Sequence, residues 1–250
     1  MKILVIGGTG HIGSKVVSKL SQIGHEVIAG SPSTGINTVT GEGLSIALKD
    51  TDVVIDISNS PSLDEIEAID FFQTSGSNLL AAAVHAGVKH HLVLSIVGVG
   101  LITRGYLAAK KVQEDLTKKS GLPYTIIRST QFFEFVPVIA SAALKEGKMH
   151  VSDIAFQPIA AADVTALISE FALAEPLNEI IEIAGPDLGT MNEFVAKYEN
   201  QVNGTDGLIV NQNSEYFGAK IPSNALVPQG AARLGNIKFE EWVLSQPGRS

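Results

Sequence analysis

The opening segment, "MKILVIGGTGHIGS", constrains the fold of this chain more than any other feature. A short apolar run over residues 2–6 predicts a buried strand, and three glycines follow in the spacing G-x-x-G-x-x-G where a helical pattern begins. Glycines allow a tight turn, and the backbone N–H groups and dipole at a helix start favour a phosphate. The segment therefore predicts a turn that binds the pyrophosphate of a dinucleotide, and the alternative is a tight turn with a purely structural role. The binding residues that it predicts are Gly7, Thr9, Gly10, His11, Ile12 and Gly13.

Short apolar runs alternate with longer helical patterns along residues 1–130, which is the rhythm of repeated β-α-β units. The runs are continuous and rich in β-branched residues, as expected for strands that helices cover on both faces. Gly24, Gly87 and Gly121 stand where helices should end before the next strand. We therefore expect an α/β fold, a Rossmann-type doubly wound parallel sheet. Its strands are predicted over residues 2–6, 25–30, 51–57, 90–96 and 123–128.

The later part of the chain has a weaker pattern. Helical segments alternate with short apolar runs at 150–152 and 180–185, and residues 203–236 are rich in Gly, Asn and Pro and predicted to be irregular. We expect a single dinucleotide-binding domain over 1–250, with a core at about 1–150 and a smaller substrate-side lobe at about 151–250.

Composition excludes several functions. The sequence has no cysteine, which rules out thiol nucleophiles and thiolate metal sites, and its net charge of -8 without a long basic cluster argues against nucleic acid. No apolar run reaches the roughly 20 residues of a membrane span, and the N-terminus does not resemble a signal peptide, so we expect a cytoplasmic protein without membrane contact. His90 and His91 begin a strand and should face opposite ways, so no metal site is expected. The expected partner is a small-molecule substrate, with a homo-oligomer left open.

The end of the second predicted strand, "IAGSPSTG", bears on the choice between NAD and NADP. An acidic residue at this place binds the ribose 2′-hydroxyl of NAD, and none is present. Ser31, Ser33 and Thr34 offer hydroxyl groups to a 2′-phosphate, although no arginine accompanies them. NADP(H) is therefore favoured over NAD(H), and the alternative is that the segment is only a polar turn.

The segment "GYLAAKKVQEDLTKK" predicts an amphipathic helix with Tyr106 and Lys110 one turn apart on the same face. Both would lie at the border between its apolar and polar sides, where a helix edge can line a cleft. The alternative is that both side chains merely extend to solvent. The apolar stripe is predicted as Ala108, Ala109, Val112 and Leu116, and the solvent side as Lys111, Glu114, Asp115 and Lys118.

In this order, "GGTGHIG", "DVVIDISNSPS", "SIVGVG", "GYLAAK" and "IIRSTQFFEF" resemble the atypical short-chain dehydrogenase/reductases, specifically the NmrA-like NAD(P)-binding group. The resemblance spans nearly the whole chain. It implies that Tyr106 exchanges a proton with a carbonyl or alcohol, and that Lys110 lowers the pKa of the tyrosine and holds the nicotinamide ribose. It also implies that Ser95 orients the substrate oxygen, while Ser95 could instead simply end its strand.

Other polar residues stand at the predicted carboxyl ends of strands. Ser58 and Asn59 resemble the segment beside the adenosine ribose, or form only a turn before a helix starting near Ser62. Thr130 and Gln131 follow the strand at 123–128, at the sheet edge where such folds bind ligands, and we count Thr130 among the cofactor residues. Phe132, Phe133 and Phe135 would wall a substrate pocket or fill the core, with at least one in the core, and Asp163 would brace the lobe.

These features together predict an NADP(H)-dependent oxidoreductase that transfers hydride between nicotinamide and a small carbonyl or alcohol substrate. Tyr106 would act as acid or base, with Lys110 and Ser95 as its partners. Two alternatives use the same dinucleotide site. One is an NAD(P)-sensing regulatory protein of the NmrA-like type, and the other is an NADPH-dependent quinone reductase, which does not need the tyrosine.

Overall fold

The computed structural model of this chain divides into two compact units. The first comprises residues 1–128 and 165–181, and the second comprises residues 129–164 and 182–250. The division comes earlier than the expected boundary near 150, and a later segment of the chain returns to the first unit. The structure describes residues 1–145, 148–202, 208–211, 215–217 and 219–246.

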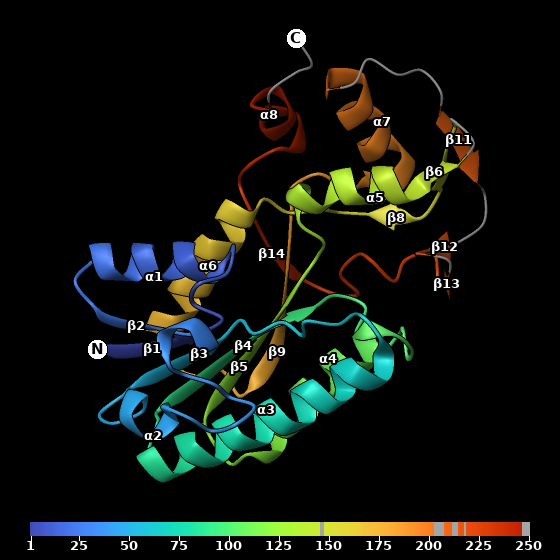
Figure 1. Ribbon diagram of the computed structural model, residues 1–250. Helices are drawn as coiled ribbons and strands as arrows, with labels where there is room; N and C mark the ends of the chain where they lie inside the picture. The colour runs from blue at the N-terminus through green and yellow to red at the C-terminus, as the bar shows by residue number, and fades with distance from the viewer. Residues whose placement is uncertain (146–147, 203–207, 212–214, 218, 247–250) are drawn as a thin grey trace. The chain divides into compact units, whose positions relative to one another are not determined.

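A seven-stranded parallel sheet forms the centre of the fold, in the order β14-β9-β5-β4-β3-β1-β2 (Figure 1). The five strands predicted before residue 130 are confirmed. From β1 the chain goes first to β2 on one side and then to β3 on the other, so the order reverses at β1. Ligands in such sheets bind at this reversal, beyond the carboxyl ends of the strands. The strands are β1 (Lys2–Ile6), β2 (Glu26–Gly30), β3 (Val53–Asp56), β4 (His90–Ile96), β5 (Tyr124–Ser129), β9 (Glu179–Ala184) and β14 (Ala232–Leu234).

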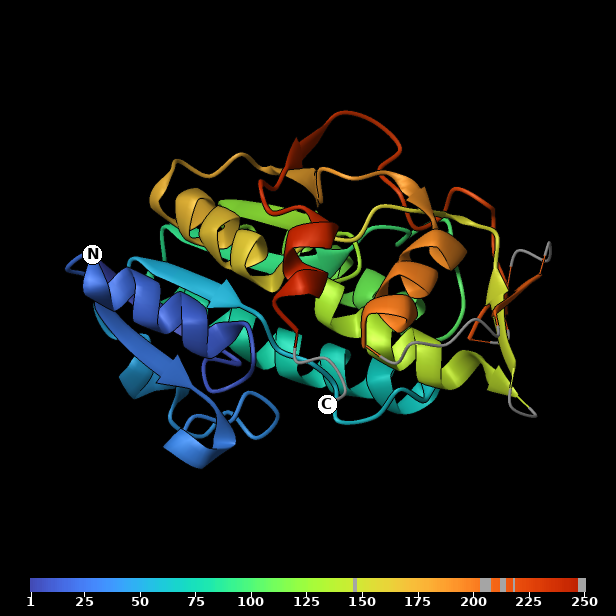
Figure 2. The same ribbon diagram turned by 90° about the horizontal axis from the view of Figure 1, so that it is seen from above.

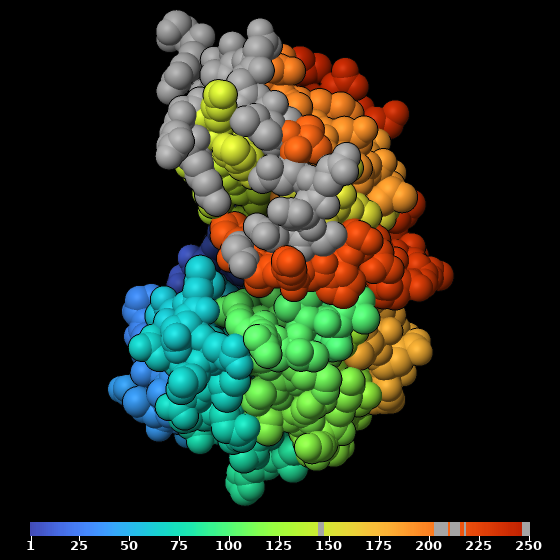
Figure 3. Space-filling model, turned by 90° about the vertical axis from the view of Figure 1, so that its right-hand side faces the viewer, coloured from blue at the N-terminus to red at the C-terminus, as the bar shows by residue number. Residues whose placement is uncertain are grey.

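Helices cover both faces of this sheet, which confirms the doubly wound fold. In Figures 1 and 2, α1 lies over one face, and α3 and α4 pack against each other on the opposite face. Figure 3 shows the cyan residues that include α3 adjoining the green residues that include α4. The helices are α1 (Gly13–Gln22), the 3₁₀ turn η1 (Pro32–Thr34), α2 (Leu44–Ala47), α3 (Glu65–Ala86), α4 (Tyr106–Lys119) and α6 (Ala161–Leu173).

The ends of α3 follow from its sequence. The Asp64 carboxylate accepts hydrogen bonds from the N–H groups of Ile66 (3.0 Å) and Glu67 (3.1 Å), so the helix begins at Glu65 rather than near Ser62. The hydroxyl of Ser62 instead accepts from the N–H of Asp64, which keeps the preceding residues in a turn. At the other end, Gly87 adopts a φ of 72°, as predicted for a residue that stops a helix.

The second unit contains more regular structure than the sequence predicts. Residues 208–211, predicted to be irregular, pair in parallel with β7, and β14 joins the main sheet beside β9. Residues 203–207, 212–214 and 218 of that stretch lie outside the described residues. The remaining elements are the 3₁₀ turn η2 (Phe133–Phe135), α5 (Val136–Ala143), β6 (Leu144–Lys145), β7 (Lys148–Ser152), β8 (Ala155–Phe156), β10 (Gly189–Thr190), α7 (Met191–Val202), β11 (Leu208–Asn211), β12 (Glu215–Tyr216), β13 (Ala219–Lys220) and α8 (Phe239–Leu244).

An aromatic cluster and one carboxylate hold the second unit together. Phe133 is fully buried and its ring packs edge-on against Phe239 at 5.1 Å, so this phenylalanine belongs to the core. The Asp163 carboxylate accepts hydrogen bonds from the N–H groups of Asn236 (3.0 Å) and Ile237 (2.9 Å). Asp163 therefore braces this unit, as predicted.

None of the helices in the described parts of the chain is both long and apolar enough to cross a membrane.

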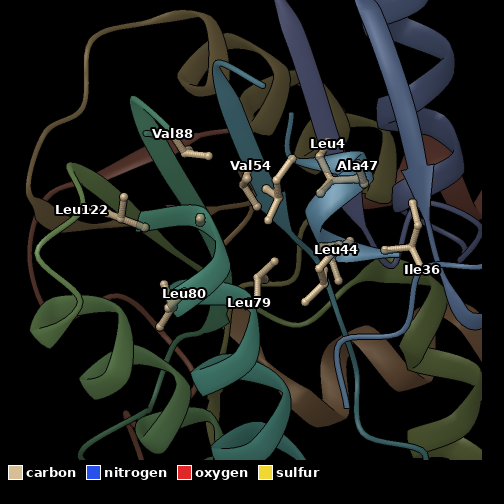
Figure 4. Packing of buried hydrophobic residues seen from close by; sticks show 12 residues of the cluster. Leu4, Ile36, Leu44, Ala47, Val54, Leu79, Leu80, Val88 and Leu122 are labelled. Atoms are coloured by element: carbon tan, nitrogen blue, oxygen red, sulfur yellow. The ribbon is translucent and has the colours of Figure 1, made fainter. Parts of the chain in front are cut away.

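A buried apolar cluster lies between the sheet and the α2 and α3 helices of the first unit (Figure 4). Its members come from strands, helices and loops far apart in the sequence, so the cluster fixes β1 and β3, whose ends carry the site described below. Its buried residues are Leu4, Ile6, Ile36, Leu44, Ala47, Leu48, Val54, Leu79, Leu80, Ala83, Val88 and Leu122.

Replacing Leu79 by alanine should lower the free energy of unfolding by about 2–5 kcal/mol, because Leu79 is 1% exposed and its removal leaves a cavity. Leu63→Ala is the matched control, because Leu63 is 75% exposed and its loss should change stability by less than about 0.5 kcal/mol. Urea unfolding followed by circular dichroism measures both. Equal effects of the two substitutions would contradict the packing described here.

Candidate functional site

The glycine turn after β1 depends on two close approaches of backbone to backbone. Gly7 has a φ of 78°, and a Cβ at this residue would lie 2.7 Å from the carbonyl oxygen of Ile57, just after β3. A Cβ at Gly13 would lie 2.1 Å from the carbonyl oxygen of Gly7. Any larger residue at either position would push the turn away from β3 or from α1. The turn is thus held at the point where the strand order reverses.

The rest of the turn fits a pyrophosphate. A Cβ at Gly10 would approach only the Gly7 carbonyl oxygen, at 3.2 Å, so this glycine leaves space above the turn. The start of α1 has no side-chain cap at Ile12 and no acidic residue in its first turn, which suits an anion at the positive end of the helix dipole. Thr9 and His11 are exposed, and the His11 ring lies 3.3 Å from the Lys15 ammonium. These residues can therefore hold the diphosphate of a dinucleotide.

In the turn after β2, some of the polar side chains form hydrogen bonds within the turn itself. The Thr34 hydroxyl lies 2.8 Å from the carbonyl oxygen of Ala29 and accepts a hydrogen bond from the N–H of Ser31 at 2.9 Å. The hydroxyls of Ser31 and Ser33 lie 2.8 Å apart. Thr34 therefore stabilises the turn itself, and the hydroxyls of Ser31 and Ser33 are left as the pair that could meet a phosphate.

Tyr106 is the first residue of α4, and this helix start is held by Asn59, from the loop after β3, and by Glu65, the first residue of α3. The N–H of Gly105, just before the helix, donates to the Glu65 carboxylate at 2.6 Å, and the Tyr106 hydroxyl donates to the Asn59 side-chain oxygen. The ring of Tyr106 packs edge-on against Phe72 at 6.0 Å. Burial raises the pKa of Tyr106 to about 12, with a smaller contribution from the negative charge of Asp56 and against a hydrogen bond to the backbone of Ser60, which lowers it.

Lys110 lies deeper than its sequence pattern suggests. Its side chain is 4% exposed, and its ammonium donates to the carbonyl oxygen of Leu94 at 2.9 Å and to the side-chain oxygen of Gln113. The ammonium also lies 4.7 Å from the centre of the Phe72 ring. Burial lowers the pKa of Lys110 to about 8, against the opposing effect of the Asp56 and Glu114 carboxylates.

The resemblance implies that Lys110 lowers the pKa of Tyr106, and this effect stays a prediction. In the structure the Lys110 ammonium donates to Leu94 and Gln113, while the Tyr106 hydroxyl donates to Asn59.

The buried side of α4 is polar, which corrects the prediction that Glu114 faces water. Glu114 is fully buried, because its carboxylate receives two hydrogen bonds from the Arg128 guanidinium, at 2.8 and 2.7 Å, and one from the Ser95 hydroxyl at 2.7 Å. A charge can be buried when it is paired in this way. Ser95 is itself 1% exposed and uses its only hydroxyl proton in this network. The structure therefore places Ser95 beneath α4 as a partner of Glu114.

The remaining predicted cofactor residues fall in both units. Ser58 and Asn59 lie in the loop after β3, and the N–H of Ser58 donates to the Asp56 carboxylate at 3.0 Å, which stabilises the turn. Thr130 lies in the second unit with Gln131. The N–H of Thr130 donates to the carbonyl oxygen of Ile183 at 3.0 Å, and its buried hydroxyl has no partner among the described residues.

The two histidines at the start of β4 are separate buried groups. A ring nitrogen of His90 lies 2.9 Å from the Thr125 hydroxyl. Burial lowers the pKa of His90 to about 4, and it also lowers the pKa of His91. In the described parts of the chain, no three His, Asp or Glu side chains gather as metal ligands would.

Sequence reasoning missed Asp56, Phe72, Gln113 and Arg128. Asp56, Gln113 and Arg128 are polar residues in segments that otherwise read as buried, and such residues normally need a partner inside the protein. That signal could have identified them, but not which partner each one finds. Phe72 gives no comparable signal, because a phenylalanine in an apolar helix is ordinary core.

Comparison with known proteins identifies the dinucleotide-binding part of the chain. Residues 7–172 match the model of a family described as NAD(P)H-binding. A photosystem II assembly factor, Ycf39, from Synechocystis is 28% identical over 54% of this chain and 46% of its own length. The chloroplastic divinyl chlorophyllide a 8-vinyl-reductase of Arabidopsis thaliana is 27% identical over 74% of this chain and 54% of its own length. The chain thus spans about half the length of these relatives.

Solved structures share the fold. The dTDP-4-dehydrorhamnose reductase of Bacillus anthracis, in complex with NADP, has a TM-score of 0.73 at 14% identity and covers 97% of both chains. The NADPH-dependent quinone oxidoreductase QOR2 of Escherichia coli has a TM-score of 0.68 at 22% identity, over 84% of this chain and 77% of its own. At these identities the likeness concerns the fold alone.

Replacing Gly10 by valine should abolish dinucleotide binding without unfolding the protein. The added side chain would point into the space above the turn, where its only near neighbour is the Gly7 carbonyl oxygen. Calorimetric titration with NADPH and NADH measures the loss of binding, and thermal unfolding checks the fold. Retained binding by the folded variant would show that the pyrophosphate does not lie on this turn.

Replacing Ser95 by alanine should lower the free energy of unfolding by about 1.5–3 kcal/mol, because a hydrogen bond to a buried charged group is lost. Ser77→Ala is the control, since Ser77 is exposed on α3 and should change stability by less than about 0.5 kcal/mol. Unchanged stability of the Ser95 variant in urea would argue against a structural role.

Proposed function

Because the chain belongs to the NAD(P)H-binding family, we propose that it is an NADP(H)-dependent oxidoreductase that moves hydride between nicotinamide and a small carbonyl or alcohol compound. The observation that carries the proposal is the short segment after β3. The Ile57 carbonyl packs against Gly7 of the glycine turn, and Asn59, two residues later, binds the Tyr106 hydroxyl. One loop thus connects the dinucleotide turn to an ionisable side chain that can exchange a proton.

A bound NADPH would supply the hydride, and the protein must supply the proton and the orientation of the acceptor. Tyr106 is the candidate for the first task, because burial keeps its phenol protonated at neutral pH and its proton can pass to the forming alkoxide when the hydroxyl turns away from Asn59. Asn59 fixes the direction of the hydroxyl, and Glu65 fixes the helix start that carries it.

Lys110 has an electrostatic role in this proposal. Its ammonium is the buried positive charge of α4, and it would favour negative charge that develops nearby and contact the nicotinamide ribose. Ser95 supports the site through Glu114, because its hydroxyl proton is engaged there. Orientation of the substrate oxygen then falls to Tyr106 and Asn59.

The preference for NADP(H) is part of the proposal. No carboxylate follows β2, and the neighbouring hydroxyls of Ser31 and Ser33 offer donors to a 2′-phosphate. These groups carry no positive charge, so the preference should be modest. Tighter binding of NADH than of NADPH would contradict this part of the proposal.

A quinone or another conjugated acceptor is the second candidate substrate. It is favoured by the engagement of Ser95 with Glu114, since reduction of such an acceptor needs the dinucleotide site but no oxyanion donor from that serine. The Arabidopsis relative, by its name, reduces a vinyl group, and the Escherichia coli neighbour a quinone. A panel of aldehydes, ketones and quinones with NADPH distinguishes the two candidates.

Replacing Tyr106 by phenylalanine should reduce carbonyl turnover by about 10²–10⁴ while leaving NADPH affinity nearly unchanged, because only the proton donor is lost. Lys110→Met should weaken both turnover and affinity, since it removes the positive charge. Single-turnover oxidation of NADPH and calorimetric titration measure the two effects.

The same pair of variants separates the alternatives. Full turnover by Tyr106→Phe on a quinone would assign the second candidate. Tight NADPH binding by the unmodified protein without turnover on any acceptor would instead support a dinucleotide sensor.

A further inference from the structure

A chain of buried hydrogen bonds runs from the loop after β3 to Lys110. The N–H of Ser58 donates to one oxygen of Asp56 at 3.0 Å, and the side-chain amide nitrogen of Gln113 donates to the other at 2.8 Å. The amide oxygen of Gln113 then accepts from the Lys110 ammonium. Asp56, Gln113 and Lys110 are each less than 5% exposed.

The partners of Gln113 fix the orientation of its amide. A carboxylate accepts hydrogen bonds only, and an ammonium donates only, so the nitrogen must face Asp56 and the oxygen must face Lys110. The Leu94 carbonyl and the Phe72 ring hold the same ammonium from β4 and α3. The Gln113 amide therefore bridges the Lys110 ammonium and the Asp56 carboxylate.

A neutral residue at this position keeps the two charges apart. A direct ion pair would draw the ammonium onto Asp56, whereas the amide satisfies both groups and leaves Lys110 at Leu94. The charged groups that act on the lysine are Asp56 from β3 and Glu114 from α4, and both favour its protonated form. Burial opposes them and is the stronger effect.

We propose that Gln113, held by Asp56, is the positioning residue for the Lys110 ammonium, and that the Ser58–Asp56–Gln113 chain ties this ammonium to the loop packed on the dinucleotide turn. The catalytic use of Lys110 rests on the proposed function, but the positioning itself does not. A glutamine that only fills space would affect stability without affecting the proton affinity or the environment of the lysine.

The decisive experiment titrates Lys110 itself, in the absence of dinucleotide. Lysine labelled with ¹³C at Cε is followed by NMR against pH, and the Lys110 signal is assigned by its loss in Lys110→Met. Gln113→Met has nearly the same shape but cannot hydrogen-bond, and it should weaken proton binding at Lys110 by about tenfold or more. Asp56→Asn should act in the same direction, since it removes the nearby negative charge.

Two further variants serve as a control and as a second test of Gln113. Gln157→Met removes another partly buried glutamine amide, which donates to the Gly185 carbonyl in the second unit, and should leave the Lys110 titration unchanged. Gln113→Asn keeps an amide but is one methylene too short to reach both Asp56 and Lys110, and it should weaken proton binding at Lys110 in the same direction as Gln113→Met. It provides the answer if Gln113→Met fails to fold.

The outcomes separate this inference from the proposed function. A Lys110 titration that is the same in the unmodified protein and in the folded Gln113→Met or Gln113→Asn variant would overturn the inference, whatever the enzyme activity. Shifted titrations in a protein that turns over no acceptor would uphold the positioning by Gln113 and reject the proposed reaction. With an active enzyme, Gln113→Met should also weaken NADPH affinity, by the same mechanism as Lys110→Met.

Discussion

The close contact between Gly7 and the Ile57 carbonyl is the constraint on which the site depends. It joins the end of β1 to the end of β3 where the strand order reverses, and it requires a residue without a Cβ and with a positive φ. Because Gly13 then packs on the Gly7 carbonyl, the start of α1 is fixed against the same turn. One backbone contact thus places both the start of α1 and the loop that reaches Tyr106.

Beneath α4 the protein buries charge where helices usually bury apolar residues. The Glu114 carboxylate is fully buried yet satisfied by Arg128 and Ser95, and the Lys110 ammonium by Leu94 and Gln113. Removing one partner of a buried pair is costly, since the other charge is left without compensation. The α4 helix is therefore held in one position on the sheet, and Tyr106 at its start is held with it.

Burial acts in opposite directions on the two ionisable residues of α4. It raises the pKa of Tyr106 to about 12 and lowers that of Lys110 to about 8, because a low dielectric disfavours the charged form of each. The tyrosine is therefore neutral near pH 7, whereas the lysine keeps most of its charge through two carboxylates nearby. The same helix thus carries a neutral phenol at its start and a largely charged ammonium one turn later.

The sequence by itself determined the fold class, the five strands before residue 130 and the glycine turn, because local periodicity and glycine spacing encode these features. It also placed Tyr106 and Lys110 on one helix. It did not predict that β14 would join the sheet, since three residues in a Gly- and Asn-rich stretch carry no periodic signal. Nor did it show that Glu114 is buried or that Ser95 is its partner. Only the tertiary structure decided these points, because the partners of a buried polar group come from distant strands and helices, and no local pattern states which of them will meet.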